Sequence, residues 1–255
     1  MTQNKRKSDN GNDQATFWEH LDELRSAIIH TLIAIGLFAV VAFVLKDELF
    51  SVVLAPRTSD FVSYRLLGVE PFSLHLMNTG LTEQFMVHMR VAIYAGVLFA
   101  SPYVLYELFR FVSPGLYQNE RRAAIRIVGS AYVMFMLGTQ VCYFIVFPLT
   151  VRFLGTYQVS ADVDNMLTIQ SYVDTLISMS LVLGVVFELP VVCAILSRMG
   201  FINRGMMTRY RKHAVVTILV IAAIITPTTD AFTLIVVALP IWLLYEISIL
   251  LVRKS

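Results

Sequence analysis

Long apolar runs alternate with short polar segments along the chain, and this pattern predicts a polytopic membrane protein made of helices. The apolar runs cover residues 26–45, 85–112, 127–149, 176–196, 214–226 and 232–252. The first run has 20 residues and no charged side chain, which is the length that a helix needs to cross a hydrocarbon core of about 30 Å. We therefore expect an all-α fold in which residues 16–252 form a single membrane domain with six transmembrane helices.

The last two runs differ from the others in their expected thickness. Residues 214–226 precede Pro227, and thirteen residues make a helix of roughly 20 Å. Pro240 and Glu246 interrupt the sixth run, so its fully apolar part is also short. Because a tight turn over residues 227–230 joins the two runs, we expect a thin helical hairpin with short fifth and sixth spans.

The segments outside the runs are predicted to be disordered or interfacial. Residues 1–15 are rich in Asn, Asp, Gln and Lys, a composition typical of disorder. Thr16 and Glu19 fit a helix-capping box. The apolar residues that follow share one helical face: Phe17, Leu21, Leu24 and Ile28. We expect a short amphipathic helix at the membrane interface, with Arg25 near its apolar side, and further short helices within residues 46–83.

The composition agrees with the bilayer as solvent. Hydrophobic residues make up 57% of the chain and charged residues 15%, and the mean hydropathy is +0.69. A soluble domain carries about 25% charged residues, so 255 residues of this composition could not hide their apolar surface in a globule. Cys142 and Cys193 lie inside apolar runs, where they are expected to be core residues rather than a disulfide or a metal pair.

The positive charges predict the orientation. Fifteen of the 20 Lys and Arg residues lie in the first 25 residues, in residues 110–126 and 198–212, or in the tail 253–255. The remaining five lie in the alternate segments: Lys46, Arg57, Arg65, Arg90 and Arg152. Positive residues are enriched in cytoplasmic loops, so both termini and the loop over residues 114–126 are expected to be cytoplasmic.

The sequence has no signature of nucleotide hydrolysis or of metal catalysis. It contains neither a Gly-x4-Gly-Lys-Ser/Thr loop nor a His-Glu-x-x-His motif, and its five histidines are scattered. We therefore expect no enzymatic activity, no cofactor, no metal ion and no nucleic-acid partner.

Three acidic residues are candidates for a function, and the residues alone leave alternatives open for each. Glu120 stands beside Arg121 after a Pro-Gly stop, so it either reads a basic motif on a partner or is a solvated acid. Glu23 either joins that recognition or covers the polar face of the first helix. Glu188 lies inside the fourth run, where an acid is a functional-site hypothesis by default, but it could also be hydrogen-bonded to a neighbouring helix.

A series of short motifs occurs in order along the chain: His20-Leu-Asp-Glu23-Leu24-Arg25, Ala55-Pro56, Ser101-Pro102, Phe111-Val-Ser-Pro-Gly-Leu-Tyr117 with Glu120-Arg121-Arg122, Tyr143-Phe-Ile-Val-Phe-Pro148, Phe187-Glu188-Leu-Pro190, Thr226-Pro227 with Asp230, and Leu239-Pro240 with Glu246. With the six runs in register, residues 17–252 resemble the TatC family, the polytopic subunits of the twin-arginine protein translocase. The family motif before Asp230 is usually one residue shorter, Thr-Pro-Pro-Asp, and from the sequence alone Asp230 could simply cap the sixth helix.

The resemblance implies export of folded proteins across the bacterial inner membrane, driven by the proton gradient. It also implies recognition of paired arginines in a signal peptide, because carboxylates accept the planar fork of arginine in bidentate fashion and lysine has no such fork. The implied signal-peptide site comprises Glu23, Glu120, Leu24, Arg25, Phe111 and Arg121. The implied intramembrane polar contacts with partners are Glu188, Tyr143 and Asp230.

The partners implied by the resemblance are the single-span subunits TatB and TatA, which we expect to dock on the fifth and sixth spans in a hetero-oligomeric complex. Two alternatives stay open. One is a proton-coupled small-solute transporter with Glu188 as the proton relay, and the other is a scaffold that gathers subunits without touching a signal peptide.

Overall fold

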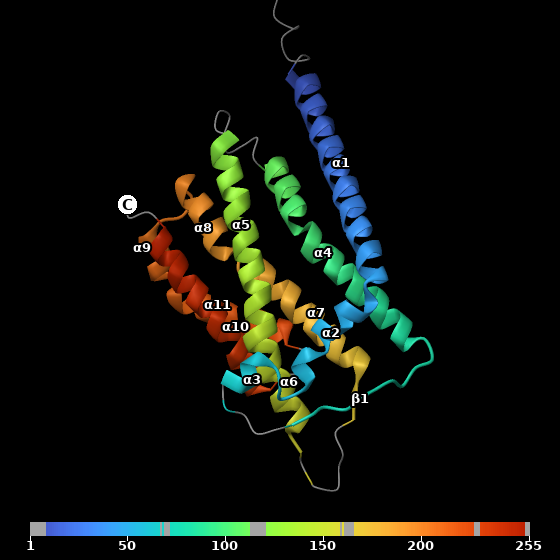
Figure 1. The fold of residues 1–255 in the computed structure, drawn as a ribbon. Helices are drawn as coiled ribbons and strands as arrows, with labels where there is room; N and C mark the ends of the chain where they lie inside the picture. The colour runs from blue at the N-terminus through green and yellow to red at the C-terminus, as the bar shows by residue number, and fades with distance from the viewer. Residues whose placement is uncertain are drawn as a thin grey trace, which may run out of the picture.

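The computed structural model describes residues 9–66, 68, 72–112, 121–158, 160, 166–226 and 230–252, with side chains from residue 21 onward except those of residues 112 and 121–124. Long helices run roughly side by side, and short elements close one end of the bundle (Figure 1). The other end gathers the first turns of α5 and the last turns of α4, α8 and α11. We call it the basic end, because Arg110, Arg126 and Arg198 lie there, and we call the opposite end the capped end.

The long helices are α1 (Asp9–Val44), α4 (Glu83–Val112), α5 (Arg121–Val141), α7 (Ile169–Val186), α10 (Arg211–Ile225) and α11 (Ala231–Leu251). A π-helical turn, η3 (Cys142–Val146), joins α5 to α6 (Phe147–Thr156), and α8 (Leu189–Arg198) follows α7 after a two-residue break. The short elements are α2 (Lys46–Val53), η1 (Ala55–Arg57), α3 (Val62–Leu66), β1 (Leu76–Met77), β2 (Leu167–Thr168) and α9 (Arg204–Arg209).

Within the described residues, five helical segments are long and apolar enough to cross a membrane: Leu21–Val44, Glu83–Phe111, Ile125–Thr156, Ile169–Arg198 and Ala231–Leu251. The sixth predicted span corresponds to the last of these, which has 21 residues, so its expected shortness is not confirmed. The fifth predicted span corresponds to α10, whose 15 residues extend about 22 Å. Six complete crossings therefore remain a prediction.

The prediction of a separate amphipathic helix before the first span is wrong. One continuous helix, α1, begins at Asp9 and extends to Val44, so Thr16 lies inside it and does not cap it. The physical reason is that no proline or glycine stands between residues 12 and 35 to end the helix. The start of α1 also lies inside the segment for which the composition predicts disorder.

The all-α expectation misses a small parallel sheet. Leu76 pairs with Leu167 and Met77 with Thr168, which joins the segment before α4 to the segment before α7. Strands of two residues are too short to leave a periodic pattern in the sequence. The third apolar run was expected to end at residue 149, but its helical segment continues through α6 to Thr156. Pro148 does not end the helix, because it lies in the first turn of α6, where a proline is tolerated.

Tyrosine hydroxyls fasten the short elements of the capped end to the long helices. Tyr64 in α3 is 1% exposed, and its hydroxyl lies 2.8 Å from the Pro148 carbonyl oxygen and 3.0 Å from that of Pro56. Burial raises the pKa of the Tyr64 phenol well above its usual value, so the hydroxyl keeps its proton. Tyr143 donates to the Val52 carbonyl at 2.7 Å and Tyr172 to that of Val53 at 3.1 Å.

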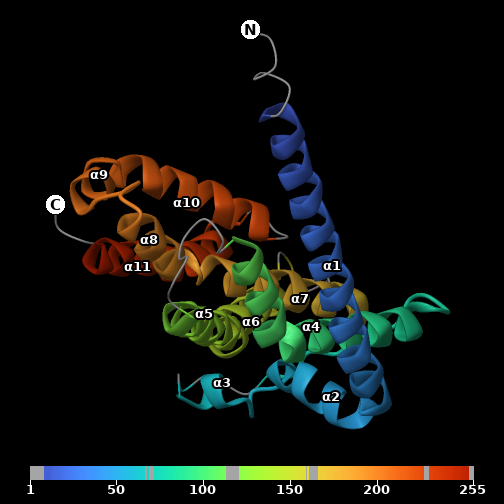
Figure 2. The ribbon, with the colours of Figure 1, turned by 90° about the horizontal axis from the view of Figure 1, so that it is seen from above.

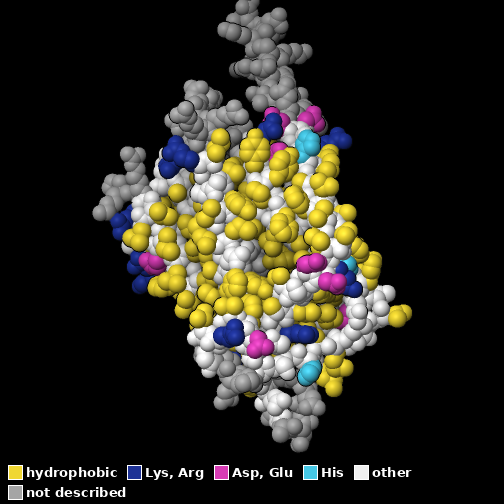
Figure 3. All heavy atoms as spheres, in the orientation of Figure 1, with side chains coloured by type: hydrophobic (Ala, Val, Ile, Leu, Met, Phe, Trp, Pro, Cys, Tyr) yellow, Lys and Arg dark blue, Asp and Glu magenta, His cyan; other side chains and the backbone are white. Residues whose placement is uncertain are grey.

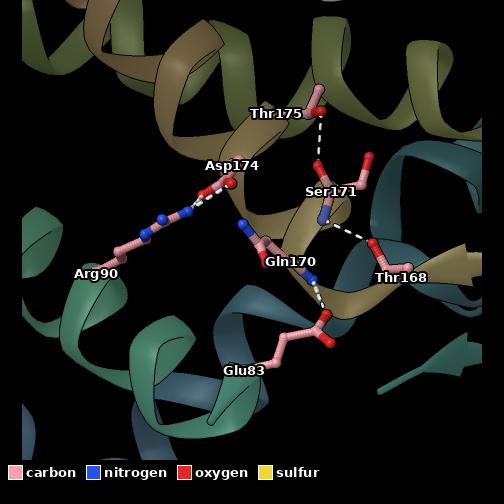
Figure 4. Close-up of polar contacts among 7 residues, drawn as sticks. All are labelled: Glu83, Arg90, Thr168, Gln170, Ser171, Asp174 and Thr175. Atoms are coloured by element: carbon pink, nitrogen blue, oxygen red, sulfur yellow. Dashed lines mark hydrogen bonds and ion pairs between the residues drawn. The ribbon is translucent and has the colours of Figure 1, made fainter. Parts of the chain in front are cut away.

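Glu83 at the start of α4 is the main polar junction of the capped end (Figure 4). Its Oε2 accepts hydrogen bonds from the Thr79 amide at 2.7 Å, the Thr79 hydroxyl at 3.0 Å and the Gly80 amide at 2.8 Å. Its Oε1 accepts from the Gln170 amide in the first turn of α7 at 3.3 Å. One carboxylate thus holds two segments that are far apart in the sequence.

The helices are arranged around α7, which packs against α4, α5 and α10. Viewed from above, α1 and α4 lie on one side and the α10–α11 hairpin on the other (Figure 2). The buried side chains of α7 include Val173, Leu176, Met179 and Leu183. At the basic end, Arg211 pairs with Glu246 at 2.7 Å, which fixes α10 to α11.

The first helix, by contrast, stands at the edge and packs chiefly on α4. Small residues, Ala42 on α1 and Ala92 and Ala95 on α4, form a buried cluster between them. Gly96 brings the backbones closest, because a Cβ built on it would lie 2.7 Å from the Ile35 carbonyl oxygen. The position of α1 therefore depends on this one contact line.

We predict that Gly96→Leu separates α1 from α4, because the new side chain meets backbone atoms that cannot yield without moving a helix. Overpacking of this kind costs about 1–3 kcal/mol, measured as the change in thermal or denaturant unfolding of the detergent-solubilised protein. Gly36→Leu on α1 is the matched control, since a Cβ there meets nothing within 4 Å. Equal destabilisation by both changes would contradict the packing role of Gly96.

We also predict that Glu83→Gln destabilises the protein more than Asp174→Asn does. In Glu83→Gln, the new side-chain amide is a donor among groups that are themselves donors. Asp174→Asn weakens the ion pair between Arg90 and Asp174. That pair is 2.6 Å long, but its two side chains are 47% and 39% exposed. Exposed ion pairs contribute about 0–1 kcal/mol. Unfolding curves of the two variants test the order, and a larger loss for Asp174→Asn would reject it.

Candidate functional site

A groove of about 400 Å³ lies between α1 and α4 at the basic end. Helix α1 contributes Glu23, Ser26, Ala27 and His30, whose spacings of three, four and seven residues place them on one helical face. Helix α4 contributes Glu107, Arg110 and Phe111 from its last turns. The groove exists because the close contact at Gly96 holds the two helices together farther along their length.

The two acids of the groove differ in their surroundings. The side chain of Glu107 is only 10% exposed, whereas that of Arg110, one turn later, is 69% exposed and lies 3.9 Å away. Glu23 is an exposed residue of α1. The groove therefore presents one shielded and one accessible carboxylate, with an apolar wall made by Ala27 and Phe111.

The structure brings some of the predicted signal-peptide residues together and not others. Glu23 and Phe111 share the groove. Arg25 lines a second groove of about 340 Å³ on an adjacent face of α1, which shares Ser26 and His30 with the first. The half-buried Leu24 lines neither groove. Glu120 lies outside the described residues, as does the side chain of Arg121, whose backbone begins α5 at the basic end.

Sequence reasoning missed Glu107 and His30 as parts of this groove. Glu107 is an acid in the last third of an apolar run, which is the same signal that marked Glu188. His30 stands seven residues after Glu23, so the helical period would have placed both on one face. Neither signal identifies α4 as the neighbour of α1, because that pairing is tertiary.

The three residues expected to make intramembrane contacts lie in different surroundings. Glu188 occupies the break between α7 and α8, and within the described residues neither of its buried carboxyl oxygens has a hydrogen-bond partner. The alternative interpretation of Glu188, a carboxyl hydrogen-bonded to a neighbouring helix, is therefore not found among the described residues. Tyr143 donates to the Val52 carbonyl and packs edge-on against Phe61.

Asp230 caps the last helix. Its Oδ2 accepts a hydrogen bond from the Thr233 amide at 2.7 Å, and α11 begins at the next residue, Ala231. The capping interpretation of Asp230 is therefore confirmed. The additional residue between Pro227 and Asp230 does not prevent the cap from forming.

The similarity to known proteins extends over nearly the whole chain. A family model described as Sec-independent protein translocase protein (TatC) matches residues 19–240. The TatC protein of Desulforapulum autotrophicum is 35% identical over 238 residues, which cover 93% of this chain and 84% of that protein. The TatC protein of Koribacter versatilis is 36% identical over 234 residues, which cover 92% of this chain and 83% of that protein.

Solved structures agree with the sequence relatives. Two crystal structures of a Twin Arginine Translocase Receptor, TatC, superpose with TM-scores of 0.75 and 0.77 at 33% and 31% identity. They cover 91% and 92% of this chain and 97% and 99% of their own lengths. The resemblance drawn from the motifs is confirmed: the chain belongs to the TatC family of Sec-independent protein translocase proteins and is a membrane component of such a translocase.

Proposed function

We propose that this chain is the receptor subunit of a twin-arginine export system and that the groove between α1 and α4 binds the paired arginines of a signal peptide. The observation that carries the proposal is the meeting of Glu23, Glu107 and Phe111 in one groove at the basic end. The solved relatives, which are named as twin-arginine translocase receptors, support the same function.

The chemistry of the groove suits two neighbouring guanidinium groups. Glu23 and Glu107 stand on facing helices, so they can receive two forks from one extended peptide. A charge-assisted hydrogen bond contributes about 1.5–3 kcal/mol, and less where water screens it. An incoming guanidinium competes with Arg110, whose distance of 3.9 Å from Glu107 makes a loose pair. Ala27 and Phe111 then receive the apolar residues that follow.

The proposed site also includes residues that the groove does not contain. Glu120 directly precedes Arg121 in the sequence, and Arg121 is the first residue of α5. We assign Glu120 the role of a further carboxylate for the arginine pair. Leu24, Arg25 and Arg121 are its proposed neighbours on the receptor surface.

We further propose that the basic end faces the cytoplasm of a bacterial inner membrane, with both termini on that side. The support is the positive-inside rule, by which Lys and Arg are enriched on the cytoplasmic side. Helices α4, α5 and α8 each place an arginine at the basic end: Arg110, Arg126 and Arg198. In this orientation the groove is open to precursors before export. Translocation itself is proposed to draw on the proton gradient.

The proposed docking surface for TatB and TatA is the α10–α11 hairpin. Apolar side chains of α10 are exposed along its length: Val216, Leu219, Val220 and Ile224. A helix of about 22 Å is shorter than the hydrocarbon core, so α10 is expected to thin the bilayer around it. Glu188, Tyr143 and Asp230 are the proposed polar contacts with partners or passenger.

The two rival functions have less support. Proton-coupled transport of a small solute through Glu188 finds no counterpart among the named relatives, which are translocase proteins. A pure scaffold would leave the acidic groove between α1 and α4 without a role.

We predict that Glu23→Gln weakens the binding of a twin-arginine peptide to the purified protein by about tenfold, which corresponds to about 1.4 kcal/mol, and that adding Glu120→Gln nearly abolishes it. The amide keeps the size of the side chain and removes the charge that accepts the arginine fork. Fluorescence anisotropy of a labelled peptide measures the affinity, with a paired-lysine peptide as the ligand control.

Asp22→Asn is the matched protein control, because Asp22 is the neighbouring acid on α1 but lines the other groove. It should leave the affinity unchanged. Undiminished binding in the Glu23→Gln, Glu120→Gln double variant would reject the proposed recognition.

A further inference from the structure

A further groove at the basic end has a composition unlike that of the groove between α1 and α4. It has a volume of about 320 Å³ and lies between the start of α5, helix α8 and the last turn of α11. Its walls are almost wholly apolar and include Met134, Val191, Ala194 and Leu251. Its lining also includes two arginines, Arg126 and Arg198, both exposed. No acidic residue is among its lining residues in the part of the chain that the structure describes.

The two arginines meet because their helices run in opposite directions. On α5 the lining begins with Arg126 and continues to Met134, eight residues farther from the basic end. On α8 it begins with Pro190 and ends with Arg198, again eight residues later but toward the basic end. Both helices therefore place a guanidinium at the basic end of the groove and apolar side chains over about 12 Å below it.

This arrangement matches the layering of a membrane. On the face that Figure 3 shows, hydrophobic side chains form a broad belt across the molecule, and most basic side chains lie toward the edges of this belt, above and below it. Where the belt ends, phospholipids present phosphate groups, and below that level they present acyl chains. A guanidinium binds phosphate oxygens with two parallel hydrogen bonds, and basic pockets between transmembrane helices bind acidic headgroups.

The order of the lining residues favours an acidic phospholipid. Two guanidinium groups lie at the basic end of a groove whose other walls are almost wholly apolar over about 12 Å. A phosphate group followed by an acyl chain has the same order.

We propose that this groove is a binding site for one acidic phospholipid, with a single acyl chain between α5, α8 and α11 and the phosphate group between Arg126 and Arg198. The site is separate from the groove between α1 and α4, and it does not depend on the proposed binding of a signal peptide. A bound acidic lipid joins the third, fourth and sixth apolar runs at the basic end.

Native mass spectrometry of the purified full-length protein tests the site, with dioleoyl phosphatidylglycerol and dioleoyl phosphatidylcholine added in turn. The wild type should retain one phosphatidylglycerol molecule at least about tenfold more strongly than phosphatidylcholine. Arg126→Gln with Arg198→Gln should remove this preference. Ala194→Trp should remove the bound lipid with both charges intact, because the larger side chain fills the acyl groove. Glycerophosphate, which has the headgroup and no chains, should not be retained.

Arg204→Gln with Arg209→Gln is the matched control, since it removes the same charge from α9, outside the groove. It should keep the preference for phosphatidylglycerol. Size-exclusion profiles identical to the wild type establish that each variant is folded. Equal retention of the two lipids by the wild type, or equal loss in the control and the groove variant, would overturn the proposal, as would retention of glycerophosphate alone.

Discussion

The close approach of α1 and α4 at Gly96 is the contact on which the acidic groove depends. Helix α1 stands at the edge of the bundle and packs chiefly on α4, where Ala42, Ala92 and Ala95 leave room for the two backbones to meet. Without a hydrophobic driving force in lipid, such contacts rest on tight van der Waals packing of small residues. The facing carboxylates at the basic end therefore owe their separation to residues near the middle of the helices.

The two ends of the molecule have different constructions. At the capped end, Glu83 and the hydroxyls of Tyr64, Tyr143 and Tyr172 bind backbone groups of segments distant in sequence. These bonds satisfy polar groups of short elements that no regular ladder covers. At the basic end, the helix termini diverge and leave an acidic groove between α1 and α4 and an apolar groove with basic residues between α5, α8 and α11. A cross-linked capped end and an open basic end suit the proposed receptor, which must hold charged side chains toward a signal peptide.

The apolar runs alone predicted the five segments that are long and apolar enough to cross a membrane within the described residues, because a membrane helix needs a continuous apolar stretch and the sequence marks it directly. The continuity of α1 and the pairing of β1 with β2 were not predictable in this way. The first depends on the absence of a helix breaker, and the second on two segments that only the tertiary fold brings together. The candidate site was likewise predicted only in part. The family motifs identified Glu23 and Phe111, whereas the role of Glu107 became visible only from the packing of α4 on α1.

The most direct test of the account asks which face of α1 meets the paired arginines. A cysteine at Ala27 lies in the groove shared with α4, and a cysteine at Ile29 lies in the neighbouring groove. Each is offered a signal peptide that carries a cysteine next to its arginine pair, under mild oxidation in native membranes. The account predicts a disulfide from position 27, none from position 29, and loss of the product when lysines replace the arginines. Crosslinking that is equal at both positions, or stronger at position 29, would contradict it.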